Sequence, residues 1–298
     1  MFGLLSINKP QGITSRAAVD HVKKLVRPAK VGHTGTLDPM ATGVLVICIG
    51  PATRLASQVQ DSDKLYTATF KLGCFSETDD LDSNVQMADN AIAVEKHELA
   101  SVIPDFIGEI EQVPPAFSAI KVDGKRAYKM ARAGEKVTLK PRPIVIKDIQ
   151  LVDFKYPEFT LRVECGAGTY IRSLGRDLAI KLGTRAVMTK LVRDRVGTFL
   201  LKDALSIDNL IKEKIETSMV DPIELLPDLQ HVVMHDQEIG KLNNGCFFSA
   251  DEVGINEALL EFVAVNSKGQ LLACMERRAD GLYKPKLNFV HYYQFQQP

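Results

Sequence analysis

Apolar residues recur along this chain with two periods, and together they predict a sheet with helices placed irregularly among its strands. A continuous apolar run at 44–49 predicts a buried strand, and alternation at 66–72 predicts a strand with one buried face. Further strands are expected at 4–8, 144–152 and 159–165. The fold class that follows is α/β or α+β.

Three helices are expected between these strands. Residues 15–26 carry apolar side chains on one helical face and begin with Ser15, a residue type that caps helix N-termini. A second helix is expected at 95–103, ended by Pro104, and a third at 170–182.

The pattern changes after about residue 225 to short apolar runs. The clearest are at 259–265 and 271–275, with a shorter one at 245–248. Ser267, Lys268 and Gly269 supply a hairpin turn between the last two runs. A separate small β domain is expected there.

The composition, with 45% hydrophobic and 25% charged residues in a chain of 298, is ordinary for a globular protein. The apolar start at 1–7 is too short for a signal peptide or a membrane span. Five cysteines without a C-x-x-C pair argue for a reducing cytoplasm and against a disulfide framework or a zinc site. We therefore expect a cytoplasmic protein with no bound metal and no membrane contact.

The charges are unevenly distributed although their formal sum is zero. Residues 121–147 hold nine Lys or Arg against two acids, and residues 74–111 hold ten acids against one Lys. Attraction to phosphates is local, so the basic segment suits a polyanion; a solvated charged surface is the alternative. Within it, 122–143 lacks a clean apolar period, which predicts an exposed excursion that is mobile in the free protein. The candidate contacts to such a polyanion are Lys121, Lys125, Arg126, Lys129 and Arg132.

A polar loop enters the buried strand through residues 33–45, HTGTLDPMATGVL. Asp38 precedes Pro39, which biases the backbone of Asp38 toward an extended conformation. Gly35 and Gly43 flank the loop, which places this carboxylate beside the sheet. An Asp-Pro pair that stands alone is more often an ordinary turn. A functional role for Asp38 therefore depends on evidence from the rest of the chain.

Six blocks occur in one order over residues 4 to about 200. They are KPQGITS at 9–15, GHTGTLDPMATGVL at 32–45, KLYTA at 64–68, QVPPAFSAIK at 112–121, GTYIRSL at 168–174, and LVR followed by GTF at 191–199. In these blocks the chain resembles the TruB-type pseudouridine synthases, enzymes that modify the uridine at position 55 of tRNA. Arg54 stands where that family often has Lys, which keeps the charge.

The resemblance implies a pseudouridine synthase fold with a mixed central sheet and flanking helices. It implies a catalytic domain at 1–225, with the basic segment 121–147 as a clamp over the RNA. A PUA-like RNA-binding β-barrel is implied at 226–298. The reaction breaks the N1–C1′ bond of uridine and rejoins the base through C5, so no redox cofactor is required.

The resemblance also assigns the site residues. Asp38 is the carboxylate that attacks the sugar C1′ or starts an elimination; the sequence leaves this open. Arg172 pairs with Asp38 and is expected to keep it ionised by depressing its pKa. Tyr66 stacks on the flipped uracil and offers a phenol that can relay a proton.

Three further residues are assigned to the substrate by the same resemblance. Tyr170 and Leu191 complete the uridine pocket, and Leu191 helps to keep it dry. His33 holds the place vacated by the flipped nucleotides and acts in binding, not as an acid or base.

Two further patterns resemble known ligand-binding motifs but lack residues that those motifs require. Asp80-x-Asp82-x-Asn84 begins like a calcium loop but lacks the required glycine, and its twelfth position is Ala91. Gly166-x-Gly168 lacks the third glycine of a dinucleotide site, although its backbone N–H groups could hold an RNA phosphate.

The leading hypothesis is therefore a stand-alone, monomeric tRNA enzyme that acts on the TΨC stem-loop without a protein partner. The alternatives are a guide-RNA-dependent relative and a non-catalytic RNA-binding or tRNA-folding protein.

Overall fold

The computed structural model describes residues 1–89, 92–122, 124–135 and 137–294. Ala91, at the end of the calcium-like pattern, and Asp123 and Lys136, in the basic segment, lie outside the described residues. In the described part no helix is long and apolar enough to cross a membrane.

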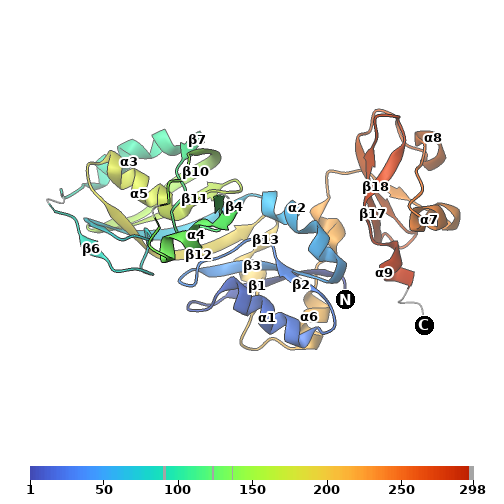
Figure 1. Cartoon of the computed structure of the whole chain (residues 1–298), viewed down its shortest axis with the longest axis horizontal. Coiled ribbons are helices and arrows are strands. Elements are labelled where there is room, and N and C mark those ends of the chain that lie inside the picture. Colours follow the sequence, from blue (N-terminus) through green and yellow to red (C-terminus); the bar gives the residue numbers. More distant parts are fainter. Residues whose placement is uncertain (90–91, 123, 136, 295–298) are drawn as a thin grey trace.

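A mixed ten-stranded sheet forms the centre of the molecule (Figure 1). Its main path is β14 (Leu205–Ser206), β1 (Gly3–Lys9), β3 (Thr42–Ile49), β12 (Ala186–Val196), β4 (Lys64–Leu72), β11 (Glu158–Cys165), β10 (Arg142–Lys155) and β7 (Gly108–Gln112). Off this path, β2 (Val31–His33) pairs with β3 and β13 (Phe199–Leu200) pairs with β12. The mixed sheet expected from the sequence is confirmed.

The sheet has a narrow seam where β3 meets β12. These two strands run parallel and pair at only two positions, Val192 with Thr42 and Arg193 with Gly43. Gly43 has φ +105°, and a Cβ there would lie 2.3 Å from the carbonyl oxygen of Arg193. Only glycine therefore permits this approach, which brings the loop before β3 against the middle of β12.

The two apolar strand patterns have different causes in the structure. Strand β3 is buried on both faces: Leu45 and Ile47 pack on α1 (Ser15–Leu25), while Val44 and Val46 contact a second core cluster. This explains its continuous apolar run. Strand β4 alternates between buried and half-buried positions, as expected for a strand with one covered face.

The expected helices are present, with one correction at an N-cap. Thr14, not Ser15, caps α1, because the Thr14 hydroxyl accepts from the N–H of Ala17 while the Ser15 side chain is buried. The other two are α3 (Lys96–Val102), followed by a 3₁₀ turn (Ile103–Phe106), and α5 (Ile171–Lys181). Leu99 of α3 and Leu174 of α5 pack on the same face of the sheet around Phe70 and Phe159.

Shorter elements complete this part of the chain. They are α2 (Ala56–Asp61), α4 (Ala127–Arg132) and α6 (Lys212–Ser218), the strands β5 (Cys74–Phe75), β6 (Gln86–Met87), β8 (Lys121–Val122) and β9 (Lys125–Arg126), and the 3₁₀ turns η1 (Gly50–Leu55), η3 (Leu201–Asp203) and η4 (Pro222–Leu225).

The basic segment contains regular structure that its sequence did not indicate. Strands β8 and β9 form a hairpin, and α4 follows with Ala127 fully buried. The N–H of Ala127 donates to Ile120 O at 2.8 Å, and that of Tyr128 to Ser118 O at 3.0 Å. The segment is therefore held by one small buried residue and by backbone hydrogen bonds. Neither of these leaves an apolar period in the sequence.

A separate sheet follows near the C-terminus, as expected (Figure 1, orange to red). It comprises β15 (His231–Val233), β16 (Glu261–Val265), β17 (Leu271–Arg277) and β18 (Tyr283–Asn288), with α7 (Asp236–Asn243), α8 (Ala250–Val253) and α9 (Val290–Gln294). In the described residues its four strands form an open sheet, not a closed barrel. The helices were missed because no long apolar run marks them.

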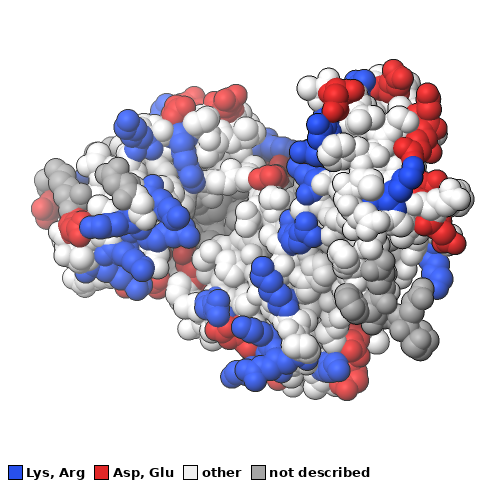
Figure 2. All heavy atoms as spheres, turned by 45° about the vertical axis from the view of Figure 1, so that its right-hand side comes forward, with Lys and Arg blue, Asp and Glu red and all other residues white. Residues whose placement is uncertain are grey.

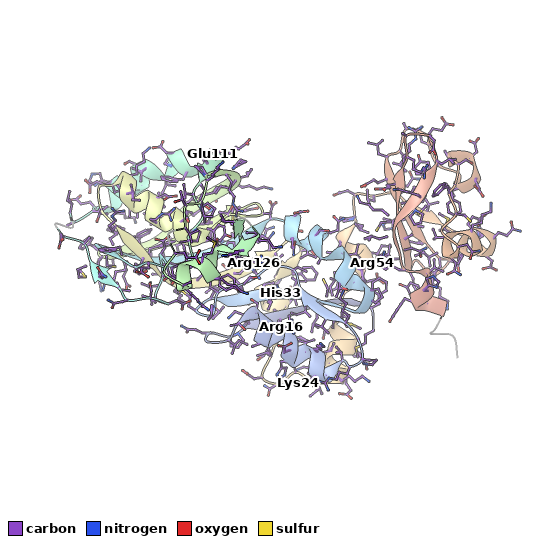
Figure 3. All side chains as sticks on the ribbon, viewed as in Figure 1. Arg16, Lys24, His33, Arg54, Glu111 and Arg126 are labelled. Atoms are coloured by element: carbon purple, nitrogen blue, oxygen red, sulfur yellow. The ribbon has the colours of Figure 1, made fainter. Side chains whose placement is uncertain are left out.

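The C-terminal sheet contacts the rest of the chain through η1. The Nη1 of Arg54, labelled in Figure 3, donates to Asn288 O at 2.7 Å. Its guanidinium also lies 5.3 Å from the ring centroid of Phe289, and Phe289 contacts the ring of Phe2 at 5.1 Å between centroids. Arg54, which stands where the family often has Lys, therefore contacts the C-terminal part of the chain.

Candidate active site

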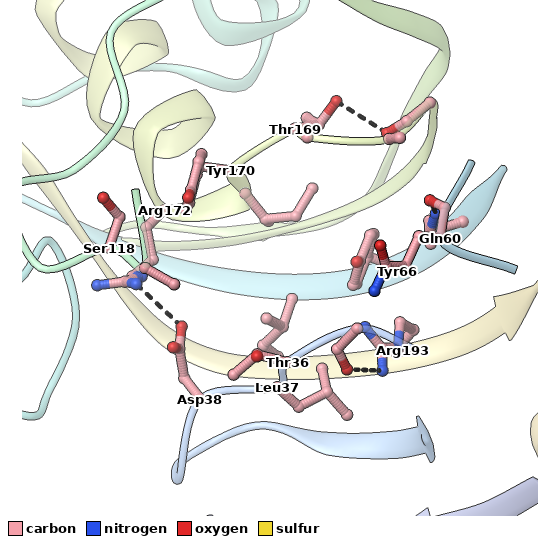
Figure 4. Close-up of a pocket in the computed structure, with 18 of the residues that line it drawn as sticks. Thr36, Leu37, Asp38, Gln60, Tyr66, Ser118, Thr169, Tyr170, Arg172 and Arg193 are labelled. Atoms are coloured by element: carbon pink, nitrogen blue, oxygen red, sulfur yellow. Dashed lines mark hydrogen bonds and ion pairs between the residues drawn. The ribbon is translucent and has the colours of Figure 1, made fainter. Parts of the chain in front are cut away.

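A cavity of about 440 Å³ opens beside the seam between β3 and β12 (Figure 4). It is lined by the loop before β3, by Tyr66 of β4, by Leu191 and Arg193 of β12, and by the segments 117–119 and 166–172. Five of the six sequence blocks, although far apart in the chain, therefore meet at one place.

The centre of this cavity is an ion pair between Asp38 and Arg172. Arg172 Nη2 lies 3.1 Å from Asp38 Oδ2, so the pair expected from the sequence is present. Arg172 is 6% exposed. It is the second residue of α5. Gly175 lets this helix lie close to the sheet, because a Cβ there would come within 2.1 Å of the Phe70 ring. The guanidinium is thereby fixed against the loop that carries Asp38.

Arg172 is shared with a second carboxylate. Its Nη1 lies 3.3 Å from Asp80 Oδ2, and Asp80 is 1% exposed. The same guanidinium donates to the carbonyl oxygens of Thr78 at 2.8 Å and Phe117 at 3.2 Å. One arginine therefore joins three segments, and its charge is divided between two acids.

The expected depression of the Asp38 pKa is wrong. Burial raises the pKa of Asp38 above its ordinary value, and this effect exceeds the lowering by Arg172. The negative charges of Asp80 and Asp82 raise it further. The sequence argument counted one cation and neither burial nor neighbouring acids, whereas in the structure Asp38 is partly removed from water and two more carboxylates act on it.

Tyr66 points into the cavity from β4 and is 9% exposed (Figure 4). Burial raises the pKa of its phenol, and the positive charge of Arg193 opposes this shift. Tyr66 and Arg193 are direct register partners on β4 and β12. The aromatic face and the phenol are both placed where a small planar ligand could contact them.

Tyr170 and Leu191 lie on the same cavity. The backbone of Tyr170 is held by the Gln112 amide: Tyr170 N donates to Oε1 at 2.8 Å, and Nε2 donates to Tyr170 O at 3.1 Å. Arg142 covers the Tyr170 ring at 5.0 Å from its centroid. Leu191 is 6% exposed and supplies an apolar wall.

His33 is not among the residues that line this cavity. It ends β2 and pairs with Ile47 of β3, so it precedes the loop instead of lying within it. Burial, and then the positive charges of Arg193 and Arg16, lower the pKa of His33. Its imidazole is therefore neutral at physiological pH, and its buried Nδ1 has no hydrogen-bond partner in the described residues.

The basic side chains proposed as RNA contacts are exposed, and their segment is bonded to the wall of the cavity. Arg126 donates to Ala119 O, and Tyr128 N donates to Ser118 O at 3.0 Å. The face of the molecule drawn in Figure 2 has a hollow in its middle, with Lys and Arg side chains on either side of it. The exposed residues of this set are Lys121, Lys125, Arg126, Lys129 and Arg132.

Sequence reasoning missed four residues that build the site: Asp80, Ser15, Lys9 and Arg193. Asp80 lies in the calcium-like pattern that was set aside, and its run of acids was a signal. Ser15 and Arg193 lie in recognised blocks, but only the structure shows what they contact. Lys9 is fully buried and donates to Ile13 O at 2.8 Å and Pro39 O at 3.4 Å, next to Asp38.

Within the described residues no group of three or more His, Cys, Asp or Glu side chains could hold a metal ion. The chemistry available to the site is that of a buried carboxylate paired with an arginine, beside an aromatic phenol. Such a set can form or break bonds at a sugar carbon and can move a proton.

Comparison with known proteins gives the same assignment for most of the chain. Residues 23–171 match the N-terminal domain of the TruB family of pseudouridylate synthases. A protein of Clostridium kluyveri named tRNA pseudouridine synthase B is 40% identical over 245 residues, which cover 82% of this chain and 84% of that protein. A protein of Dehalococcoides mccartyi with the same name is 35% identical over 294 residues, with 97% of each chain covered.

Among solved structures, a Cbf5–Nop10–Gar1 complex aligns with a TM-score of 0.70 and 25% identity over 93% of this chain and 78% of that chain. An archaeal box H/ACA Nop10–Cbf5 complex shares the fold, with a TM-score of 0.68 and 22% identity over 93% of this chain and 79% of that chain. The fold and these similarities define an isomerase that makes pseudouridine. The chain belongs to the TruB family of pseudouridylate synthases.

Proposed function

We propose that this protein converts uridine 55 in the TΨC loop of tRNA to pseudouridine, with Asp38 as the nucleophile on a flipped-out uridine. The observation that carries the proposal is the ion pair of Asp38 with Arg172, 3.1 Å apart at the centre of a cavity that also holds Tyr66. Full-length similarity to proteins named tRNA pseudouridine synthase B supports tRNA as the substrate.

The cavity offers each part that the reaction needs. Asp38 keeps 32% of its side chain accessible, so a substrate carbon can reach it, while Arg172 is almost fully buried behind it. Tyr66 supplies a face for an extruded base, which stabilises a flipped nucleotide by roughly 1–3 kcal/mol. Tyr170 and Leu191 close the same space, and a dry pocket strengthens the charge interactions within it.

The remaining assignments of the site follow the same proposal. His33, neutral and outside the cavity, contacts the RNA near the position that the flipped nucleotides leave. The exposed basic residues of 121–132 bind phosphates of the stem, and the C-terminal part, 226–298, forms a second RNA-binding unit after a catalytic unit at 1–225. No protein partner is required.

One experiment tests the substrate and the position together. Purified protein is incubated with an unmodified tRNA transcript, and pseudouridine is mapped along the RNA by position. We expect modification at position 55 alone, in the absence of any other protein, and none with an Asp38→Asn variant. A transcript with cytidine at position 55 is the matched control.

The same assay addresses the two alternatives. The Cbf5 proteins among the similar structures are in complexes with other proteins. Activity that appears only when a guide RNA and partner proteins are added would favour a guide-dependent enzyme. Tight tRNA binding without any pseudouridine would favour an RNA-binding role and contradict the catalytic proposal.

A further inference from the structure

Arg193 is a buried arginine that lines the active-site cavity without an acidic partner. It is 3% exposed, and no carboxylate lies within 4.0 Å of it in the part of the chain that the structure describes. Its Nε donates to Val44 O at 2.7 Å and its Nη2 to Gly35 O at 3.2 Å. A buried cation held only by neutral carbonyl groups is costly, which suggests that its charge serves the site.

The two carbonyl bonds fix the position of the guanidinium. Val44 belongs to β3 and Gly35 to the loop that carries Asp38, so Arg193 ties both to β12. Gly43 permits this, because a side chain there would collide with the Arg193 backbone. The arginine is therefore held by the same loop that presents the proposed nucleophile.

The register partner of Arg193 on the neighbouring strand β4 is Tyr66. The two residues are opposite each other on adjacent strands and line the same cavity, and the positive charge of Arg193 lowers the pKa of the phenol against the effect of burial. Figure 4 shows both at the same end of the pocket, away from the ion pair of Asp38.

The other groups around Tyr66 oppose a negative charge on its oxygen. Burial disfavours the phenolate most, and Cys165 on β11 and Asp38 at the other end of the pocket disfavour it further. Lys64, on the strand of Tyr66, is turned toward the carbonyl oxygens of Gln60 and Ser62. Arg193 is the cation placed to stabilise that oxygen.

We propose that Arg193 is a positioning residue that holds the Tyr66 oxygen and stabilises it as a phenolate while Tyr66 transfers a proton during the rearrangement. This inference rests on the proposed function. The phenol O–H gives its proton to N1 of the detached base, and the resulting phenolate takes the proton from C5. One N–H bond forms, one C–H bond breaks, and the phenol is restored.

The test compares Arg193→Met, which removes the charge at similar length, with Arg193→Lys, which keeps it. Single-turnover rates are measured at saturating tRNA from mildly acidic to alkaline pH. We expect Arg193→Met to lose roughly tenfold or more at neutral pH, since a hydrogen bond to a charged group is worth about that factor. The loss should shrink as pH rises, and Arg193→Lys should retain most of the rate.

A second measurement separates the electrostatic role from a structural one. Difluorotyrosine, a more acidic phenol, is placed at position 66 in the unsubstituted chain and in Arg193→Met. It should move the pH–rate profile of the unsubstituted chain to lower pH and restore part of the rate of Arg193→Met. A loss that is equal at every pH and is not restored would overturn the proposal.

The inference can also be tested without turnover. Fluorine NMR of the RNA-free protein follows the titration of the difluorotyrosine at position 66. With Arg193→Met this titration should occur at higher pH than with Arg193 present, and an unchanged titration would refute the inference. If Arg193→Met does not fold, the protein that carries only difluorotyrosine at position 66 is used instead. A pH–rate profile that is unchanged by this fluorinated residue would then refute the inference. If the titration moves but no pseudouridine forms, the proposed function fails instead.

Discussion

The hydroxyl of Ser15 makes two hydrogen bonds with the backbone of Leu37, the residue before Asp38. Ser15 Oγ donates to Leu37 O at 3.0 Å, and Leu37 N donates to Ser15 Oγ at 2.8 Å. Both residues are buried. The first turn of α1 therefore fixes the loop of the proposed nucleophile, although 22 positions separate the two residues.

Replacing Ser15 with Ala should lower both stability and turnover. Two buried backbone groups lose their partner, which costs about 1–3 kcal/mol, and the loop before Asp38 becomes less constrained. Thr14→Ala is the matched control, because it removes the cap of the same helix for about 1 kcal/mol without touching the loop. Denaturant unfolding and single-turnover rates distinguish the two; equal turnover in both variants would contradict a positioning role for Ser15.

Asp38→Asn should abolish pseudouridine formation and leave tRNA affinity within a few-fold of the unsubstituted protein. The amide is nearly isosteric but is not a nucleophile, and most binding energy comes from RNA contacts outside the cavity. Filter binding and position mapping measure the two quantities. Turnover near the original rate would rule out the assignment of Asp38.

The same variant should be more stable than the original protein at neutral pH. The pKa of Asp38 is raised in the folded state by burial, so the folded protein favours the protonated form, and this contribution to stability is lost as pH rises through the folded pKa. Asparagine mimics the protonated form. The difference in unfolding free energy should vanish as pH falls below the ordinary value of 3.8, and a difference that persists there would have another cause.

Asp80→Asn should destabilise the protein and move the acid limb of the pH–rate profile to lower pH. Removing one partner of a buried ion pair typically costs about 3–5 kcal/mol, and the negative charge of Asp80 raises the pKa of Asp38. Asp82→Asn is the control: Asp82 also raises that pKa, but it is exposed and forms no ion pair with Arg172. It should move the limb in the same direction at little cost in stability.

Replacing Lys125, Arg126, Lys129 and Arg132 with Ala should weaken tRNA binding and flatten its salt dependence. Each lost phosphate contact reduces the slope of log K against log[salt] by roughly 0.7–0.9. The chemical step at saturating tRNA should change much less. A fourfold variant of exposed lysines away from the cavity, Lys155, Lys202, Lys212 and Lys214, is the control; equal slopes in the two variants would show that 121–132 is an ordinary solvated surface.

The sequence by itself determined the class of fold, five of the ten strands of the central sheet, and the residues of the ion pair. Strand β3 and strand β4 could be predicted because burial on two faces or one leaves a direct trace in the order of apolar residues. Asp38 and Arg172 could be predicted because each stands in a block of fixed residue types that resembles a family.

Only the tertiary structure decided which groups surround that pair. Arg193 reaches the site at the seam between β3 and β12, Ser15 through its bonds with Leu37, and Asp80 through its ion pair with Arg172. No local pattern in the sequence records such contacts. The direction of the Asp38 pKa shift depended on summing burial, two cations and two neighbouring acids. The sequence identifies the charged residues, but the electrostatic energy of each depends on its distance from other charges and on its burial. Distances and burial are defined only in the folded chain.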